Sequence, residues 1–176
     1  QLPDYRACFQ HAAAALRAAF PAVQIAWSSS KIYRLNYTVD QMNPGDQWFD
    51  IYGLLYYDNY TPLQSQATWD KYVNAYKGTG GSPSGIGSWL AYATSHGKKL
   101  GVSEWGIWDR PEWDTPTADD PVYIHDMYQF FKANAASIAY EAYQNNNTSA
   151  TDGHQLCPTT PFPRAQAAYA QLWRAG

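Results

Sequence analysis

Residues 49–58 read FDIYGLLYYD, and this stretch carries the clearest strand signal in the sequence. It is almost continuously apolar, whereas a strand with one solvent-exposed face alternates apolar and polar side chains. Such a run is expected for a parallel strand that is covered on both faces. The turn signal NPGD at residues 43–46 comes shortly before it. We therefore predict a buried parallel strand over residues 48–58.

Helical and strand patterns alternate along much of the remaining chain, which predicts an α/β fold with a parallel sheet and right-handed crossovers. The segments that follow the strands are long and aromatic, so the functional face is expected at the carboxyl ends of the strands. Residues 28–30 and 144–161 are interpreted as loops. The other strands are predicted at residues 23–27, 100–105 and 136–143, and the helices at 3–20, 66–77, 84–96, 121–134 and 163–173.

The composition limits the classes of function. A chain of 176 residues has room for one domain with a real core. Its net charge of −3 and the lack of a basic stripe argue against nucleic acid as a partner, and no apolar run approaches the roughly 18 residues of a membrane span. The eight Trp and fifteen Tyr suit half-exposed surfaces that stack on ligands. The four histidines have no metal-ligand spacing, so we predict neither a catalytic metal nor any other cofactor.

Several features fit a secreted protein. The sequence starts at Gln1 without methionine or a signal peptide, so we expect a processed product or a cut piece. Charged residues are few, and N-x-S/T triplets at Asn36, Asn59 and Asn146 permit glycosylation. The two cysteines do not form a disulfide framework. We expect an extracellular location.

The predicted strand at residues 100–105 ends on Glu104, within VSEWG at 102–106. A carboxylate in this position beside an indole is costly to bury without a partner. It either forms a structural salt bridge or serves as the nucleophile of a sugar-cleaving site. A retaining mechanism requires a second carboxyl about 5–5.5 Å away, and only three glutamates are present: Glu104, Glu112 and Glu141.

Four segments, taken in their order, resemble clan A glycoside hydrolases. Residues 49–58, ending in YYD, are similar to the sixth strand of those barrels. VSEWG resembles the seventh strand, which carries the nucleophile in that clan, and IAYEAYQN at 138–145 resembles the eighth. FPRA at 162–165, followed by Tyr169, Leu172 and Trp173, resembles the last helix of family 26, the β-mannanase family.

The resemblance implies a (β/α)8 TIM-barrel fold of which residues 1–176 form a single partial domain with strands five to eight. A complete barrel runs to about 250 residues. Glu104 is then the nucleophile in retaining hydrolysis of a β-linked, mannan-like polysaccharide. The general acid/base of the family comes from the fourth strand, outside this chain. The implied partners are a polysaccharide or oligosaccharide and either a missing N-terminal half or a second copy of the chain, in which Cys8 and Cys157 could find partners.

Other residues near strand ends are candidates for substrate contacts. A phenol from Tyr57 could hold the orientation of the nucleophile, although the register does not separate Tyr57 from Tyr56. Glu141 is expected to hydrogen-bond or contact substrate, with a proton-donor role as a weaker alternative. His154 is interpreted as a surface residue or a substrate contact. Indoles that stack on sugar rings are expected among Trp27, Trp105, Trp108 and Trp113; one or two of them should line subsites, and the others should pack. Asp58 and Asn145 are expected to bind hydroxyls, with capping of the backbone as the alternative. The alternative function is a non-catalytic carbohydrate-binding or scaffold protein derived from such a barrel.

Overall fold

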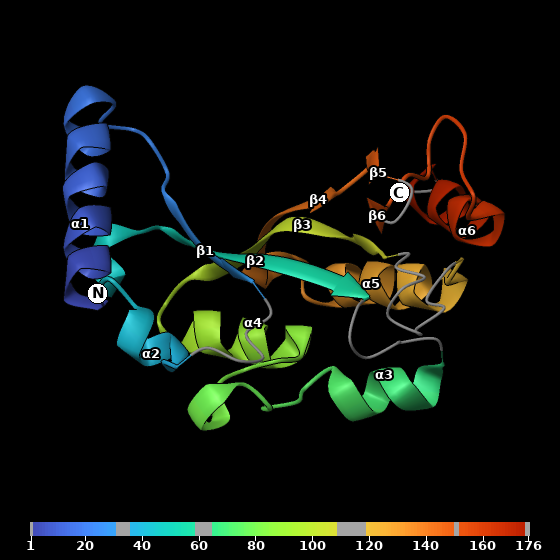
Figure 1. Cartoon of the computed structure of the whole chain (residues 1–176), viewed down its shortest axis with the longest axis horizontal. Helices are drawn as coiled ribbons and strands as arrows, with labels where there is room; N and C mark the ends of the chain where they lie inside the picture. Colours follow the sequence, from blue (N-terminus) through green and yellow to red (C-terminus); the bar gives the residue numbers. More distant parts are fainter. Residues whose placement is uncertain (1, 31–35, 59–64, 109–118, 150–151, 175–176) are drawn as a thin grey trace.

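The computed structural model describes residues 2–30, 36–58, 65–108, 119–149 and 152–174. Its centre is a four-stranded parallel sheet in the order β1-β2-β3-β4. The strands are β1 (Ala26–Ser30), β2 (Ile51–Asp58), β3 (Lys99–Ile107) and β4 (Ile138–Tyr143). Figure 1 shows these strands side by side, with β2 pointing away from the end at which α1 (Leu2–Ala19) lies. The predicted parallel sheet is confirmed.

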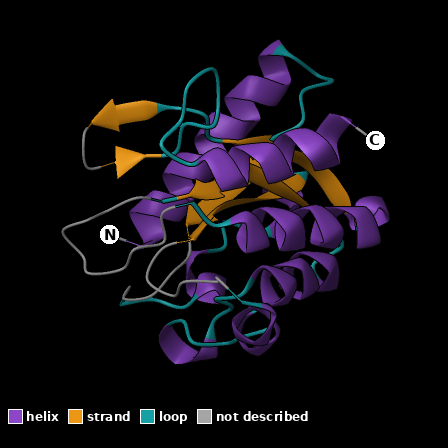
Figure 2. Cartoon of the chain, turned by 90° about the vertical axis from the view of Figure 1, so that its right-hand side faces the viewer, coloured by secondary structure: helices purple, strands orange, loops and turns teal. Residues whose placement is uncertain are grey.

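Helices pack on one face of the sheet. The long ones are α4 (Ile86–Ser95), α5 (Pro121–Ala133) and α6 (Pro163–Arg174), and shorter ones are α2 (Val39–Met42) and α3 (Gln66–Tyr72). Single turns of 3-10 helix occur at Asp46–Trp48, Thr79–Gly81 and Ala135–Ser137. Figure 2 looks from the carboxyl end of β2, with the strands at the centre.

Local sequence explains where these helices begin. Asp120 accepts hydrogen bonds from the backbone N–H groups of Val122 and Tyr123, and Pro121 occupies the first position of α5. Both are favoured at a helix start, because the first N–H groups lack partners within the helix. Asp119 similarly accepts a hydrogen bond from the N–H of Ala165 in the first turn of α6.

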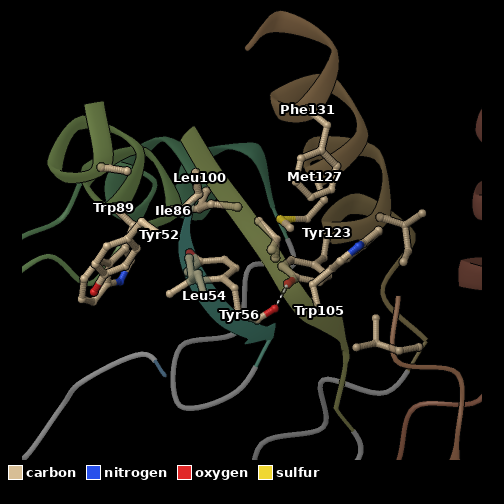
Figure 3. Close-up of a cluster of buried hydrophobic side chains, with 14 of the residues drawn as sticks. Tyr52, Leu54, Tyr56, Ile86, Trp89, Leu100, Trp105, Tyr123, Met127 and Phe131 are labelled. Atoms are coloured by element: carbon tan, nitrogen blue, oxygen red, sulfur yellow. Dashed lines mark hydrogen bonds between the residues drawn. The ribbon is translucent and has the colours of Figure 1, made fainter. Parts of the chain in front are cut away.

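The core lies between the sheet and these helices. Tyr52, Leu54 and Tyr56 alternate along β2 and are at most 1% exposed. Figure 3 shows Trp105 of β3 gathered with Tyr123, Met127 and Phe131 of α5. The opposite face carries smaller or more exposed residues, including Ser28, Leu55, Ser103 and Tyr140. No long described helix packs on this second face, which we call the open face.

Several element bounds differ from the predictions; for example, α3 ends at Tyr72 instead of residue 77, and β3 continues to Ile107 instead of ending at residue 105. The first strand covers Ala26–Ser30 instead of residues 23–27, because the serines predicted as a loop pair with residues 53–55 of β2. The second begins at Ile51 instead of residue 48, since Asp46–Trp48 form a 3-10 turn. The segment predicted as a polar loop contains a short antiparallel pair, β5 (Asn147–Ser149) and β6 (Asp152–Gly153).

Candidate active site

One extra residue in β3 determines which side chains reach the open face. Val102 pairs with Leu54 of β2, and the next pair is Glu104 with Leu55, so Ser103 is left over. The register with β4 shows the same excess, because two steps in β4 match three in β3. A bulge of this kind changes the direction in which neighbouring side chains point. Ser103 and Glu104 therefore both point to the open face, whereas Val102 and Trp105 both enter the core.

Tyr57 holds the carboxylate of Glu104. Its phenolic O–H donates a hydrogen bond to Oε2 of Glu104 at 2.7 Å. Tyr56, which the sequence could not separate from Tyr57, points to the core, and its backbone carbonyl accepts a hydrogen bond from Tyr123 (Figure 3). Because a bond to an ionised acceptor is stronger than a neutral one, the Tyr57 phenol orients the carboxylate and leaves Oε1 for another partner.

Three rings form a wall beside this pair. The ring centroids of Tyr57 and Trp108 are 4.9 Å apart and nearly perpendicular. The ring of His154 lies 4.9 Å from that of Tyr57 and 5.0 Å from that of Trp108. Trp108 is partly exposed, so it retains surface for a ligand, as its predicted role requires.

His154 is 6% exposed and so is not the surface residue that one interpretation expected. Its Nδ1 lies 2.6 Å from the carbonyl oxygen of Ile107. A carbonyl only accepts hydrogen bonds, so Nδ1 carries a proton and is the donor of this bond.

Glu141 and Trp105 lie on the helix-covered face. Oε2 of Glu141 accepts a hydrogen bond from the Trp105 indole at 2.5 Å, and Oε1 accepts one from Trp173 at 3.0 Å. The predicted hydrogen-bonding role of Glu141 is therefore present, but its carboxylate points away from the face of Glu104. Trp105 is completely buried. The prediction that its ring stacks on a sugar is wrong, because the helix layer covers it.

Two other residues predicted to contact sugar, Trp27 and Asp58, are also buried. Trp27 is 2% exposed, packs against Phe49 and Tyr52, and donates its indole N–H to Tyr5. It therefore offers no ring face to a ligand. Asp58 is fully buried at the end of β2, so the prediction that it binds sugar hydroxyls does not hold in this structure.

Asn145 organises the chain that follows β4. Its Oδ1 accepts hydrogen bonds from the backbone N–H groups of Leu156 and Cys157, and its Nδ2 donates to the carbonyl of Cys157. These bonds give it the backbone-binding role that short polar residues often have. The structure does not place it as a sugar ligand. Trp113 and Glu112 lie outside the described residues.

Burial raises the pKa of two groups, Asp120 and Tyr143. It raises the pKa of Asp120 above the usual range, although bonds from backbone N–H groups and from Asp58 act in the opposite direction. Burial also raises the pKa of the Tyr143 phenol, which donates a hydrogen bond to the carbonyl of His154 at 2.9 Å. Both groups are thus uncharged over a wider pH range than when exposed.

The described residues contain no cluster of three His, Cys, Asp or Glu side chains that could hold a metal ion. None of the described helices is both long and apolar enough to cross a membrane. Cys8 and Cys157 are both free and exposed.

Sequence reasoning missed a polar group on the open face. The hydroxyl of Ser103 lies 3.4 Å from that of Ser28 and 3.1 Å from that of Tyr140. Ser28 was assigned to a loop, and neither Ser103 nor Tyr140 has a local motif that indicates a site. Ser28, Ser103 and Tyr140 lie on β1, β3 and β4, and their proximity would have been indicated only with the bulge already known.

The sheet, its one-sided helix layer and the carboxylate at the end of β3 define part of a (β/α) barrel. No family model matches the sequence, and no curated protein matches it either. Two solved structures have a similar fold. GH26C from Muricauda sp. MAR_2010_75 is 14% identical with a TM-score of 0.59, and the match covers 97% of this chain and 42% of that one. The catalytic domain of the Bacillus sp. JAMB-750 GH26 endo-β-1,4-mannanase is 18% identical with a TM-score of 0.56, covering 96% and 44%.

The chain therefore has the fold of part of a glycoside hydrolase family 26 catalytic domain and spans less than half the length of either structure. This confirms the predicted partial barrel. At such low identity the similarity shows the fold alone, because one fold supports many functions.

Proposed function

We propose that this chain carries the nucleophile of a retaining glycoside hydrolase and that Glu104 is this nucleophile. The supporting observation is the hydrogen bond from Tyr57 to Glu104 on the open face, at the carboxyl end of the sheet. Active sites of (β/α) barrels lie at that end.

The geometry suggests how the first step proceeds. Tyr57 binds Oε2, so Oε1 of Glu104 attacks the anomeric carbon. A carbon–oxygen bond forms to the carboxylate while the glycosidic bond breaks, and the leaving oxygen takes its electron pair and a proton from a general acid. Water then attacks the anomeric carbon and gives a proton to the same group, now acting as base, while the bond to the carboxylate breaks and restores Glu104. In this proposal the general acid lies outside the chain, as the resemblance to family 26 implies, and Glu141 points to the other face.

The proposed substrate is a β-linked polysaccharide of the mannan type. Support comes from the similar structure whose name describes an endo-β-1,4-mannanase and from the partly exposed Trp108 beside Glu104. We further propose that the open face is completed by a second half-barrel, either a further segment or another copy of this chain, and that the protein acts outside the cell.

A reagent that needs no general acid tests the nucleophile directly. The reagent is a 2-deoxy-2-fluoro-β-mannoside that carries a dinitrophenolate leaving group. The dinitrophenolate departs without protonation, and the fluorosugar remains on the protein as a long-lived glycosyl-enzyme. We expect mass spectrometry to find one added sugar on the peptide that contains Glu104. Glu104→Gln abolishes this label. The matched control Asp70→Asn, on the exposed surface of α3, retains it.

Labelling of any other residue, or equal labelling of the Glu104→Gln variant, would contradict the proposal. The orientation of Glu141 also favours a second candidate, a carbohydrate-binding protein without catalysis. Unlabelled wild-type protein that still binds mannan would support that candidate.

A further inference from the structure

We propose that His154 is a positioning residue that holds the Tyr57 phenol against Glu104. The expected effect of His154 on the reactivity of Glu104 rests on the proposed function, whereas its effect on the orientation of Tyr57 does not. The inference begins from a buried histidine that the glycosidase mechanism above does not use.

His154 is fixed by hydrogen bonds to three parts of the chain. Its Nδ1–H donates to the carbonyl of Ile107 at the end of β3, at 2.6 Å. Its backbone N–H donates to the carbonyl of Asn146 at 3.0 Å, and its own carbonyl accepts the Tyr143 phenol of β4 at 2.9 Å. With backbone and ring both restrained, the imidazole has one orientation.

The ring transfers this restraint to Tyr57. The two centroids are 4.9 Å apart with planes at 37°, and Trp108 packs edge-on against both rings, at 85° and 86°. These separations lie within the range in which aromatic pairs attract one another. Tyr57 is 8% exposed, so its ring is enclosed on the sides where it would otherwise rotate.

A phenol held in this way keeps its oxygen at 2.7 Å from Glu104 before any ligand arrives. Holding a reactive group in its productive orientation in advance lowers the cost of reaching the transition state. The bond from His154 to Ile107 also links this arrangement to β3, the strand that carries Glu104. The positions of both His154 and Glu104 are therefore fixed by the same strand, β3.

Two substitutions separate the functions of the imidazole. His154→Phe keeps an aromatic ring beside Tyr57 but cannot donate to Ile107. His154→Asn keeps an N–H close to the Nδ1 position but removes the ring. The proposal requires both features. The exposed histidine of α5 provides the control His125→Phe.

The first measurement uses NMR and needs no catalysis. Long-range ¹H–¹⁵N spectra should show His154 protonated on Nδ1. Tyr57→Phe should displace the side-chain carboxyl ¹³C resonance of Glu104, and each His154 variant should displace it in the same direction. In the Tyr57→Phe background the His154 substitutions should add nothing, because a residue that acts through Tyr57 has no separate effect. His125→Phe should leave the resonance unchanged.

The second measurement is the rate at which the fluoromannoside labels Glu104. Misplacement of a catalytic group by about 1 Å costs about 10²-fold, so we expect the His154 variants to slow labelling by up to that factor. Circular dichroism verifies that they are folded, and His154→Asn remains informative if His154→Phe does not fold.

An unshifted Glu104 resonance in a folded His154 variant would overturn the inference, as would additive effects with Tyr57→Phe. If the wild-type chain takes no label while the NMR results hold, the proposed chemistry fails and the positioning role stands.

Discussion

The single hydrogen bond between Tyr57 and Glu104 gives the first test at the scale of residues. Tyr57→Phe removes the donor and preserves the ring that packs on Trp108 and His154. A bond to a charged group contributes about 1.5–3 kcal/mol, and each 1.36 kcal/mol corresponds to about tenfold in rate. We therefore expect labelling of Glu104 to slow by about 10-fold to 100-fold in stopped-flow or mass-spectrometric assays.

Tyr76, which is 55% exposed, provides the control for this change. Tyr76→Phe should leave the labelling rate unaltered. A rate in Tyr57→Phe that equals the wild-type rate would mean that the phenol does not assist Glu104.

Asp126 of α5 is a second residue with a measurable consequence. It is 4% exposed, and burial raises its pKa, while the hydrogen bond from His125 acts in the opposite direction. A raised folded-state pKa stabilises the fold fully below the unfolded pKa, about 3.9, and this contribution is lost as the pH rises through the folded value. Urea unfolding from pH 3.5 to 7 should therefore show Asp126→Asn gaining stability relative to wild type as the pH rises.

Asp50 supplies the opposite trend. Burial alone would raise its pKa, but bonds from the Ile25 N–H and from Arg17 outweigh burial and lower it. The stability that Asp50 contributes is present above its unfolded pKa and is lost as the pH falls through the folded value. Asp50→Asn should lose stability relative to wild type as the pH rises from about 2 to 4, and equal pH profiles for the two variants would contradict both assignments.

At the scale of elements, the bulge in β3 can be removed. Deleting Ser103 makes the pairing of Val102 and Glu104 with Leu54 and Leu55 continuous, and it also removes the excess over β4. Glu104 then still faces the open side and Trp105 still faces the core. We expect the deletion to cost no more than the usual range for a single change, about 0.5–3 kcal/mol, as measured by urea unfolding.

Deletion of Val102 is the matched comparison. It would place Ser103 in the core position that Val102 fills at 0% exposure, so a polar group would be buried at the expense of an apolar one. We expect it to be the more destabilising deletion. The reverse order would show that the extra residue in β3 is not Ser103.

The same bulge shows why the sequence predicts where β3 lies but not which of its side chains point to each face of the sheet. Apolar runs identify β2 and β3, because a parallel strand that is buried on both faces consists mainly of apolar residues. Strict alternation from Val102 would send Glu104 to the core and Trp105 to the open face, and no residue type in VSEWG marks the extra position. Glu104 became a candidate because VSEWG resembles a barrel strand, and Tyr57 could not be separated from Tyr56. The indoles of Trp27 and Trp105, which are buried, were included among the candidate sugar contacts.

Pairing between distant segments also lies beyond local patterns. Three consecutive serines favour a loop by propensity, yet β1 gains a ladder of bonds by lying along β2. The buried position of His154 likewise depends on Ile107, 47 residues earlier. Neither contact leaves a periodic signal in the sequence.

At the scale of the whole molecule, apolar surface remains uncovered at both flanks of the sheet. Tyr5 and Leu16 of α1 are each 44% exposed, Phe20 is 65% exposed, and Tyr140 of β4 is 38% exposed. Among the described strands, β1 pairs only with β2, and β4 only with β3. Exposed apolar patches and free strand edges favour association, and two four-stranded halves supply the eight strands that a closed barrel needs.

We therefore expect the isolated chain to associate with a second copy, so that its mass by light scattering rises above 19.8 kDa as concentration increases. Replacing Leu16 and Phe20 together by serine should shift this rise to higher concentration. The stability of the single chain should hardly change, because exposed side chains contribute little to it. Tyr76→Ser, an equally exposed change away from α1, should leave the association as it is. A mass of 19.8 kDa at every concentration would instead mean that α1 and the sheet edges need no cover from a second copy.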